Sequence, residues 1–291
     1  MSDLGTILTA VVTPFDERLR VAEEAFVRLL HHLAATGSDG AVVAGTTGEA
    51  ATLTDEEQLA LIELAVRERP AGFRIIAGTG SNDTRHAVYL TERATELGVD
   101  GTLVVTPYYN RPPERGIIRH YEAVDRATDK PIVLYNIPSR TGTNMGPQLL
   151  ARLAELEHVV AVKQANPKEL QQIEGLALYA GNDDLFAPTL ELGGAGGILV
   201  ASHIVGPQLR RMVEEPQRRA ELDASLKDVY ETLSITTNPI GIKAALNLLG
   251  FAVGGLRLPL VEADQREVEA IRAMLTRQGL LAGGRPVASA A

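Results

Sequence analysis

The 291-residue sequence predicts one closed α/β barrel, a (β/α)8 or TIM barrel, with a C-terminal helical extension, and three observations support this fold class. The chain has the usual length of such a barrel. Eight short runs of apolar and β-branched residues recur along it. Between these runs, apolar residues return at helical spacing, which is the alternation expected of a parallel sheet wound with crossover helices.

The eight expected strands are residues 7–13, 41–45, 74–80, 102–106, 131–136, 159–163, 177–181 and 197–202. Their apolar residues are continuous rather than alternating, which is typical of strands covered by helices. Clear helical patterns follow the second, third and fourth strands, at residues 55–68, 83–97 and 114–127. Eight such units in one domain-sized chain favour a closed barrel over a doubly wound open sheet, which shows the same alternation.

Helical patterns continue beyond the eighth strand, near residues 216–233, 239–249 and 262–276. We therefore expect a barrel over residues 1–215 and a helical extension of the same unit over residues 216–280. The small and turn-forming residues of the last segment predict a flexible tail over residues 281–291.

The composition excludes several functional classes. The 28 Lys and Arg against 37 Asp and Glu give a formal net charge of −9, which argues against nucleic acid or an anionic membrane as a partner. The absence of cysteine excludes disulfides, thiol catalysis and Cys-ligated zinc, and it suits a protein of the reducing cytoplasm. The apolar stretch at residues 7–12 is too short for a signal peptide or a membrane span.

Lys163 is the most informative candidate for chemistry. Active sites of such barrels lie at the carboxyl ends of the strands, and Lys163 ends the sixth strand directly after the apolar residues 159–162. Burial disfavours the ammonium form and lowers the pKa of a lysine, and a neutral amine can attack a ketone to form a Schiff base. The alternative is a strand-end lysine that faces solvent or pairs with a carboxylate.

Other strand ends supply partners for Lys163. Tyr135 ends the adjacent fifth strand and could pass protons, although core packing is the commoner role of a tyrosine. Thr46 and Thr47 lie between two glycines and could bind a small carboxylate, where the alternative is an ordinary polar turn. Arg140 could hold a second carboxylate bidentately, and its alternative is a surface arginine.

Three further features favour structural roles. The glycine-rich residues 193–197 precede the eighth strand and so lie at the amino-terminal face, where they indicate tight packing rather than a phosphate loop. Lys243 lies in an expected helix at residues 240–249 and is interpreted as structural or peripheral. The histidines include no pair at metal-ligand spacing, since His31 and His32 face different ways on a helix, and we predict no metal site.

Four segments that follow one another along the chain form a recognisable series. They are Gly45-Thr46-Thr47-Gly48-Glu49, Tyr108-Tyr109-Asn110-Arg111-Pro112, Tyr135-Asn136-Ile137-Pro138-Ser139-Arg140-Thr141-Gly142 and Val162-Lys163. Together they resemble the dihydrodipicolinate synthase family, within the neuraminate-lyase group of class I aldolases. The similarity extends from Thr9 to Ile240, nearly the whole chain.

The resemblance implies an enzyme of lysine and diaminopimelate biosynthesis that condenses pyruvate with L-aspartate 4-semialdehyde. It implies that Lys163 forms the imine with pyruvate and that Tyr135 shuttles protons, with Thr46 and Tyr109 as relay partners. It implies substrate-binding roles for four more residues: Thr47 at the pyruvate carboxylate beside Thr46, Arg140 at the carboxylate of the aldehyde, Gly181 and Ile198.

The resemblance also implies an assembly and the absence of a cofactor. The imine serves as the electron sink, so no metal or organic cofactor is expected. The expected assembly is a homotetramer built as a dimer of dimers, in which Tyr108 or Tyr109 reaches across into the neighbouring site.

The sequence departs from the family pattern at one place, and two alternative functions are still open. After Lys163 the chain reads Gln164-Ala165-Asn166, where family members often carry an acidic residue and then a small hydroxyl residue. A pyruvate aldolase acting on a 2-keto-3-deoxy sugar acid or a neuraminate-type substrate would share the imine but use another aldehyde, and Arg140 favours the synthase over it. A catalytically silent sensor of small acids is a third reading, disfavoured by the joint presence of Lys163, Tyr135, Thr46 and Tyr109.

The resemblance further suggests how the chain responds to lysine. Relatives that are inhibited by lysine bind it at the dimer interface, and the corresponding positions here include Asp55, Gln58, Asn82, His86 and Tyr108. His86 replaces a Glu that pairs with the ammonium group of the ligand, and charge-assisted bonds are the strong ones. Asp55 could compensate, but it is expected to begin a helix and to interact with the helix dipole. We therefore predict weak or absent inhibition by lysine.

Overall fold

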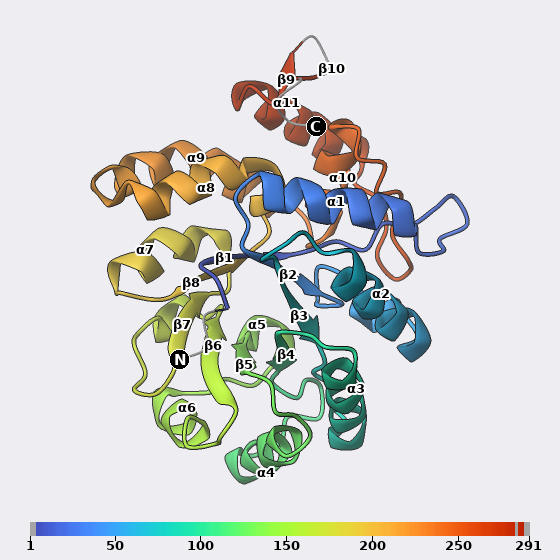
Figure 1. Ribbon diagram of the computed structural model, residues 1–291. Helices are drawn as coiled ribbons and strands as arrows, with labels where there is room; N and C mark the ends of the chain where they lie inside the picture. The colour runs from blue at the N-terminus through green and yellow to red at the C-terminus, as the bar shows by residue number, and fades with distance from the viewer. Residues whose placement is uncertain (1–3, 283–284, 288–291) are drawn as a thin grey trace.

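The computed structural model describes residues 4–282 and 285–287, and it confirms the predicted barrel. Eight parallel strands pair in chain order, and β8 pairs with β1 to close the sheet. Figure 1 shows these strands at the centre of a ring of helices. The strands are β1 (Ile7–Ala10), β2 (Gly40–Val43), β3 (Arg74–Gly78), β4 (Gly101–Val105), β5 (Ile132–Asn136), β6 (Val159–Gln164), β7 (Ala177–Ala180) and β8 (Gly196–Leu199).

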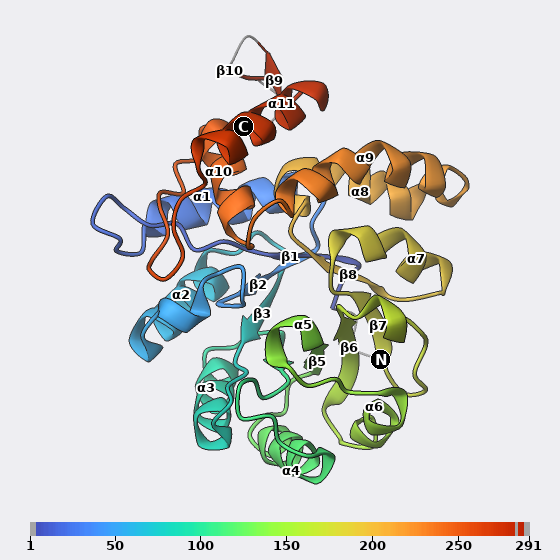
Figure 2. The ribbon, with the colours of Figure 1, turned by 180° about the vertical axis from the view of Figure 1, so that it is seen from behind.

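Helices between the strands cover the outside of the barrel. A capping box of Thr54 and Glu57 begins α2, and the Asp83 side chain caps α3. The short helix α5 (Pro138–Thr141) differs from the others, because it lies across one end of the barrel (Figure 2). The covering helices are α1 (Glu23–Ala35), α2 (Asp55–Glu68), α3 (Thr84–Glu96), α4 (Glu114–Asp125), α6 (Pro147–Leu153), α7 (Phe186–Glu191) and α8 (Ser202–Glu214), with 3-10 turns η1 (Ala50–Thr52), η2 (Pro167–Glu169) and η3 (Asp183–Leu185).

Several strands end earlier than their sequence pattern predicts. The pattern of the second strand reaches residue 45, but β2 ends at Val43 because Ala44 adopts a positive φ of 53° that breaks the ladder. The first and eighth strands likewise stop three residues before the end of their apolar runs. In each case the remaining apolar residues form the start of a loop at the carboxyl end of the barrel.

The segment after β8 is helical, as expected. Its helices pack against one another and onto α8 at one side of the barrel (Figure 1), and none of the helices in the described part of the chain is long and apolar enough to cross a bilayer. Its elements are the turn η4 (Pro216–Arg218) and the helices α9 (Arg219–Leu233), α10 (Ile240–Leu248) and α11 (Gln265–Arg277).

Part of the expected flexible tail is paired instead. The strand β9 (Leu281–Ala282) lies antiparallel to β10 (Arg285–Pro286). The Leu281 side chain is buried, and the backbone N–H of Val287 donates to the carbonyl of Leu280, so apolar packing and backbone bonds fix this short hairpin. The other residues of the expected tail, 283–284 and 288–291, lie outside the described residues.

The interior of the barrel positions the site. Side chains alternate between the two faces of a strand, and Val133 and Tyr135 of β5 and Ala161 of β6 belong to the apolar cluster inside the barrel. Lys163 follows Ala161 by two residues and pairs in register with Tyr135. Both side chains therefore lie on the inner face, at the carboxyl ends of adjacent strands.

Candidate active site

A cavity of about 520 Å³ at the carboxyl ends of the strands brings most of the predicted residues together. The predicted residues that line it are Thr46, Thr47, Tyr135, Arg140, Lys163 and Gly181. The residues to which sequence reasoning gave no role are Ile137, Asn182, Asp183, Asp184, Val200, Lys227, Tyr230, Glu231, Leu233, Ser234 and Asn238. The helical extension thus forms one wall of the cavity.

Lys163 has the environment of a nucleophilic amine. Its residue is only 5% exposed, and burial lowers the pKa of its amine to about 7 against the opposing influence of the Asp183 carboxylate. Nζ lies 4.2 Å from the centre of the Tyr135 ring, and within the described residues it makes no hydrogen bond or ion pair. A large share of neutral amine is therefore available near pH 7.

Tyr135 is suited to hold a proton beside that amine. Burial raises the pKa of its phenol to about 12, so the hydroxyl stays protonated at neutral pH. Its hydroxyl makes no hydrogen bond to Thr46 or to any other residue from 4 to 282. The predicted relay is therefore not formed within one chain.

The two threonines lie on the loop after β2 and differ in exposure. Thr47 is 3% exposed, while Thr46 is exposed toward the cavity. The loop ends at Glu49, which has a positive φ of 57° and a fully buried side chain. Hydroxyls and backbone N–H groups beside a buried amine can bind a small anion.

Arg140 belongs to α5, and its loop is fastened to both neighbouring strands. The N–H of Met145 donates to Asn136 Oδ1 (3.0 Å), and Asn136 Nδ2 donates to Gln164 Oε1 (3.0 Å). Gln164 occupies the position where the family often has an acidic residue. Its neutral amide thus joins the ends of β5 and β6 beneath the loop that carries Arg140.

Asp183 is a buried charged group of the cavity to which sequence reasoning gave no role. Its Oδ1 accepts the backbone N–H groups of Val200 (2.9 Å) and Ala201 (3.0 Å), which fixes it at the end of β8. Burial raises the pKa of the carboxyl to about 6. The sequence did carry a signal, because Asp183 lies in the loop just after the seventh strand, where site residues of these barrels are found.

Two predicted residues do not line the cavity of their own chain. Tyr109 is 90% exposed and has a positive φ of 70°, so its ring extends away from the molecule. Ile198 is 1% exposed and belongs to the apolar cluster inside the barrel together with Tyr135 and Tyr179. Its side chain lies in the core below the site, and Val200 lines the cavity instead.

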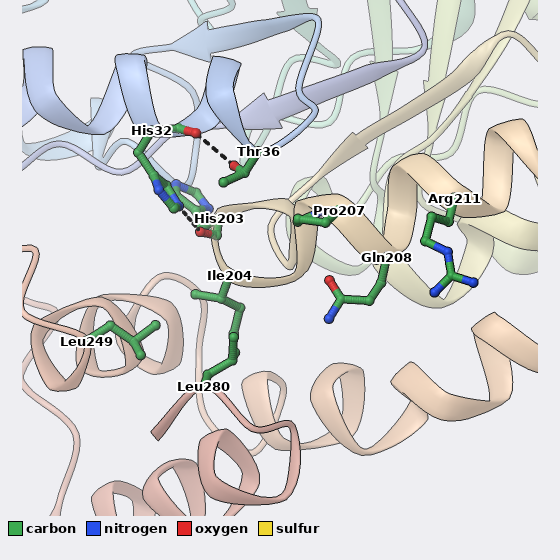
Figure 3. A pocket seen from close by; sticks show the side chains of 9 residues that line it. All are labelled: His32, Thr36, His203, Ile204, Pro207, Gln208, Arg211, Leu249 and Leu280. Atoms are coloured by element: carbon green, nitrogen blue, oxygen red, sulfur yellow. Dashed lines mark hydrogen bonds between the residues drawn. The ribbon is translucent and has the colours of Figure 1, made fainter. Parts of the chain in front are cut away.

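A second cavity, of about 370 Å³, lies between α1, α8 and the end of the helical extension (Figure 3). Its histidines have structural roles. His32 Nε2 hydrogen-bonds the carbonyl of His203 (3.0 Å), to which Pro207, four residues later, has no N–H to donate. The His203 ring bonds the carbonyl of Val200 and the N–H of Val12. No group of three or more potential metal ligands occurs in the part of the chain that the structure describes.

Lys243, the other buried lysine, has a different environment from that of Lys163. Its Nζ pairs with Glu49 Oε1 at 2.8 Å and donates to the carbonyl of Thr13 at 3.0 Å. Both side chains of the ion pair are at most 1% exposed. The structural role expected from the sequence agrees with these contacts.

Comparison with known proteins identifies the family of this chain. The model of the Dihydrodipicolinate synthetase family matches residues 3–278, almost the entire chain. The chain belongs to this family. The 4-hydroxy-tetrahydrodipicolinate synthase of Heliobacterium modesticaldum is 44% identical over 290 residues, covering 96% of this chain and 97% of that protein. The same enzyme of Thermosynechococcus vestitus is 43% identical, covering 97% and 99%.

Solved structures of family members superpose closely on this chain. The DHDPS of Cyanidioschyzon merolae, crystallised with lysine bound, gives a TM-score of 0.93 at 40% identity and covers 97% of this chain and 100% of that chain. The chloride-inhibited dihydrodipicolinate synthase of Acinetobacter baumannii, in complex with pyruvate, gives 0.92 at 32% identity, with 96% and 100% covered. The family and the barrel fold found by these comparisons are thus the ones that the sequence predicts.

Proposed function

We propose that this protein is a 4-hydroxy-tetrahydrodipicolinate synthase, which condenses pyruvate with L-aspartate 4-semialdehyde for lysine and diaminopimelate biosynthesis. The observation that supports this most is the buried amine of Lys163, which has no hydrogen bond or ion pair among the described residues and faces Tyr135 in a cavity that also contains Thr46, Thr47 and Arg140. The chain's relatives, at more than 40% identity over nearly their whole length, are named as this enzyme.

The first half of the reaction forms and activates an imine. The Lys163 amine attacks the ketone carbon of pyruvate, and loss of water from the carbinolamine leaves the imine. Tyr135 can donate the proton that the departing hydroxyl needs and take it back later. The imine then withdraws electrons from the methyl carbon, which loses a proton to give an enamine. The imine itself serves as the electron sink, so the proposed reaction requires no metal or organic cofactor.

The second half joins the aldehyde and releases the enzyme. The enamine carbon attacks the aldehyde carbon, forming one carbon–carbon bond and regenerating the imine. The amino group of the former semialdehyde then attacks the imine carbon and displaces the Lys163 amine, which closes the ring. Arg140 is the proposed partner of the aldehyde's carboxylate, because a guanidinium binds a carboxylate through two parallel hydrogen bonds.

The proposal is tested by trapping the imine. Borohydride reduction in the presence of pyruvate should attach one reduced pyruvyl group per chain, and peptide mass mapping should locate it on Lys163. Lys163→Met keeps the length of the side chain and should abolish the label. Label on Lys243, or active enzyme without any label, would contradict the mechanism. Turnover of a 2-keto-3-deoxy sugar acid without use of aspartate semialdehyde would favour the aldolase alternative.

The proposed assembly is the homotetramer that the family resemblance implies, working in the cytoplasm. The position of Tyr109 supports a neighbouring chain: its side chain is 90% exposed and does not line the cavity of its own chain, so the relay role that the resemblance implies requires it to enter the site of another chain. Sedimentation at micromolar concentration tests the assembly. Tyr109→Phe should lower turnover while leaving the sedimentation coefficient unchanged.

A further inference from the structure

Asn238, two residues before α10, contacts two of the side chains proposed to bind substrate carboxylates, Thr47 and Arg140. Its Nδ2 donates to Thr47 Oγ1 at 2.9 Å, and its backbone carbonyl accepts from Arg140 Nη2 at 3.3 Å. Asn238 also lines the cavity. The helical extension therefore makes direct contact with the loops after β2 and β5, which come from different sides of the site.

The hydrogen bond from the Asn238 amide to the Thr47 hydroxyl oxygen directs the hydroxyl hydrogen toward a different acceptor. A hydroxyl has one hydrogen, and Thr47 Oγ1 already accepts a hydrogen from the amide. Among the residues described, none accepts a hydrogen bond from this hydroxyl. Its hydrogen is thus available to an anion in the cavity, and accepting one hydrogen bond strengthens a hydroxyl as a donor in the next.

The same helix holds the far end of the loop. Lys243, one turn into α10, forms the buried ion pair with Glu49, which lies two residues after Thr47. The ion pair fixes the backbone of the loop from behind. The Asn238 amide, two residues before α10, contacts the substrate-facing hydroxyl of Thr47.

We propose that Asn238 is a positioning residue for the pyruvate carboxylate: its amide orients the Thr47 hydroxyl to donate into the cavity. The inference rests on the proposed function. Its contact with Arg140 runs through the backbone carbonyl, which every side-chain substitution retains. Changes at the Asn238 side chain should therefore affect the use of pyruvate and leave the use of the aldehyde nearly unchanged.

The test compares Asn238→Ala with the neighbouring Thr237→Ala, since Thr237 is exposed and its side chain makes no hydrogen bond within the described residues. Loss of one hydrogen bond near 1 kcal/mol corresponds to about a fivefold change. In Asn238→Ala, the pyruvate concentration for half-maximal trapping on Lys163 should rise about threefold to tenfold. The KM for the aldehyde at saturating pyruvate should change less than about twofold. Thr237→Ala should match the wild type.

A double-mutant cycle separates positioning from general damage. In a Thr47→Val background the hydroxyl is gone, so adding Asn238→Ala should have no further effect on trapping. Equal effects with and without the Thr47 hydroxyl, or an unchanged trapping curve in Asn238→Ala, would overturn the inference. Asn238→Ser replaces the alanine variant if circular dichroism shows that the latter is unfolded. Failure of wild-type trapping would count against the proposed function instead, so the two failures are distinguishable.

Discussion

At the scale of single residues, two buried lysines in one chain have opposite surroundings. Lys243 has a carboxylate at 2.8 Å, while Lys163 has the face of an aromatic ring and a more distant carboxylate, Asp183. Burial lowers the pKa of both amines, and only at Lys243 does a directly bonded carboxylate oppose it. Reactivity therefore follows from the partners of a lysine, which the local sequence around residues 163 and 243 does not contain.

The lowered pKa of Lys163 predicts a dependence of activity on pH. The ammonium form is not nucleophilic, so kcat/KM for pyruvate should fall about tenfold per pH unit below about 7 and level off above it. The negative charge of Asp183 raises the pKa of Lys163, so Asp183→Asn should move the midpoint to lower pH. A profile measured from pH 5.5 to 9 checks both expectations. A midpoint near 10, or a shift to higher pH in Asp183→Asn, would contradict them.

Arg140 carries a prediction about the second substrate. Removing a hydrogen bond to a charged group costs about 1.5–3 kcal/mol, so Arg140→Ala should raise the KM for aspartate semialdehyde by about 10- to 150-fold. Trapping of pyruvate should change much less, because the guanidinium is proposed to bind only the aldehyde. Arg140→Lys keeps the charge without the forked geometry and should be intermediate. Equal losses for both substrates would argue for a structural role.

At the scale of elements, the positions of the strands could be predicted from the sequence more accurately than the residues at which they end. A continuous run of apolar residues such as 159–162 predicts a strand buried on both faces, and β6 (Val159–Gln164) contains it. The same rule extended the second strand through Ala44, where a positive φ ends the ladder. Apolar character indicates burial, but it does not reveal where the backbone leaves the sheet to form a loop.

The pair of Glu49 and Lys243 gives a prediction about how α10 supports its neighbours. Lys243→Met leaves the buried Glu49 carboxylate without its cationic partner, with the backbone N–H of Arg257 as its remaining donor, and should lower the free energy of unfolding by about 3–5 kcal/mol. The double variant Glu49→Gln with Lys243→Met removes both charges and should recover most of that loss. Urea denaturation of the wild type, the single variant and the double variant measures the free energy of unfolding of each. If the double variant were as unstable as the single one, the ion pair would not be the cause.

At the scale of the whole molecule, the site is assembled from the barrel and the extension together. The rule that barrel sites lie at the carboxyl ends of strands was enough to bring Thr46, Tyr135 and Lys163 together from the sequence. No corresponding rule places helices that follow the eighth strand. Asn238 and Tyr230 line the cavity from that segment, and their sequence separation from the strands gave no sign of it.

The response to lysine is the prediction that concerns the assembled enzyme, because the family resemblance implies a lysine site between chains. In this structure His86 Nε2 lies 2.8 Å from Asp55 Oδ1, and Gln58 Nε2 donates to the carbonyl of Ala50 at 3.0 Å. The carboxylate that could replace the missing Glu is thus already bound to His86, so a cationic ligand has to compete for it.

We therefore expect L-lysine to inhibit the purified enzyme weakly or not at all, although the C. merolae relative was crystallised with lysine bound. His86→Glu supplies a carboxylate beside Asp55, and it should lower the lysine concentration for half-inhibition because two anions favour an ammonium between them. Titrating L-lysine against the wild type and the His86→Glu variant gives the concentration for half-inhibition of each. Half-inhibition of the wild type below about 1 mM corresponds to more than about 4 kcal/mol of binding and would show that the bond between His86 and Asp55 does not prevent lysine from binding.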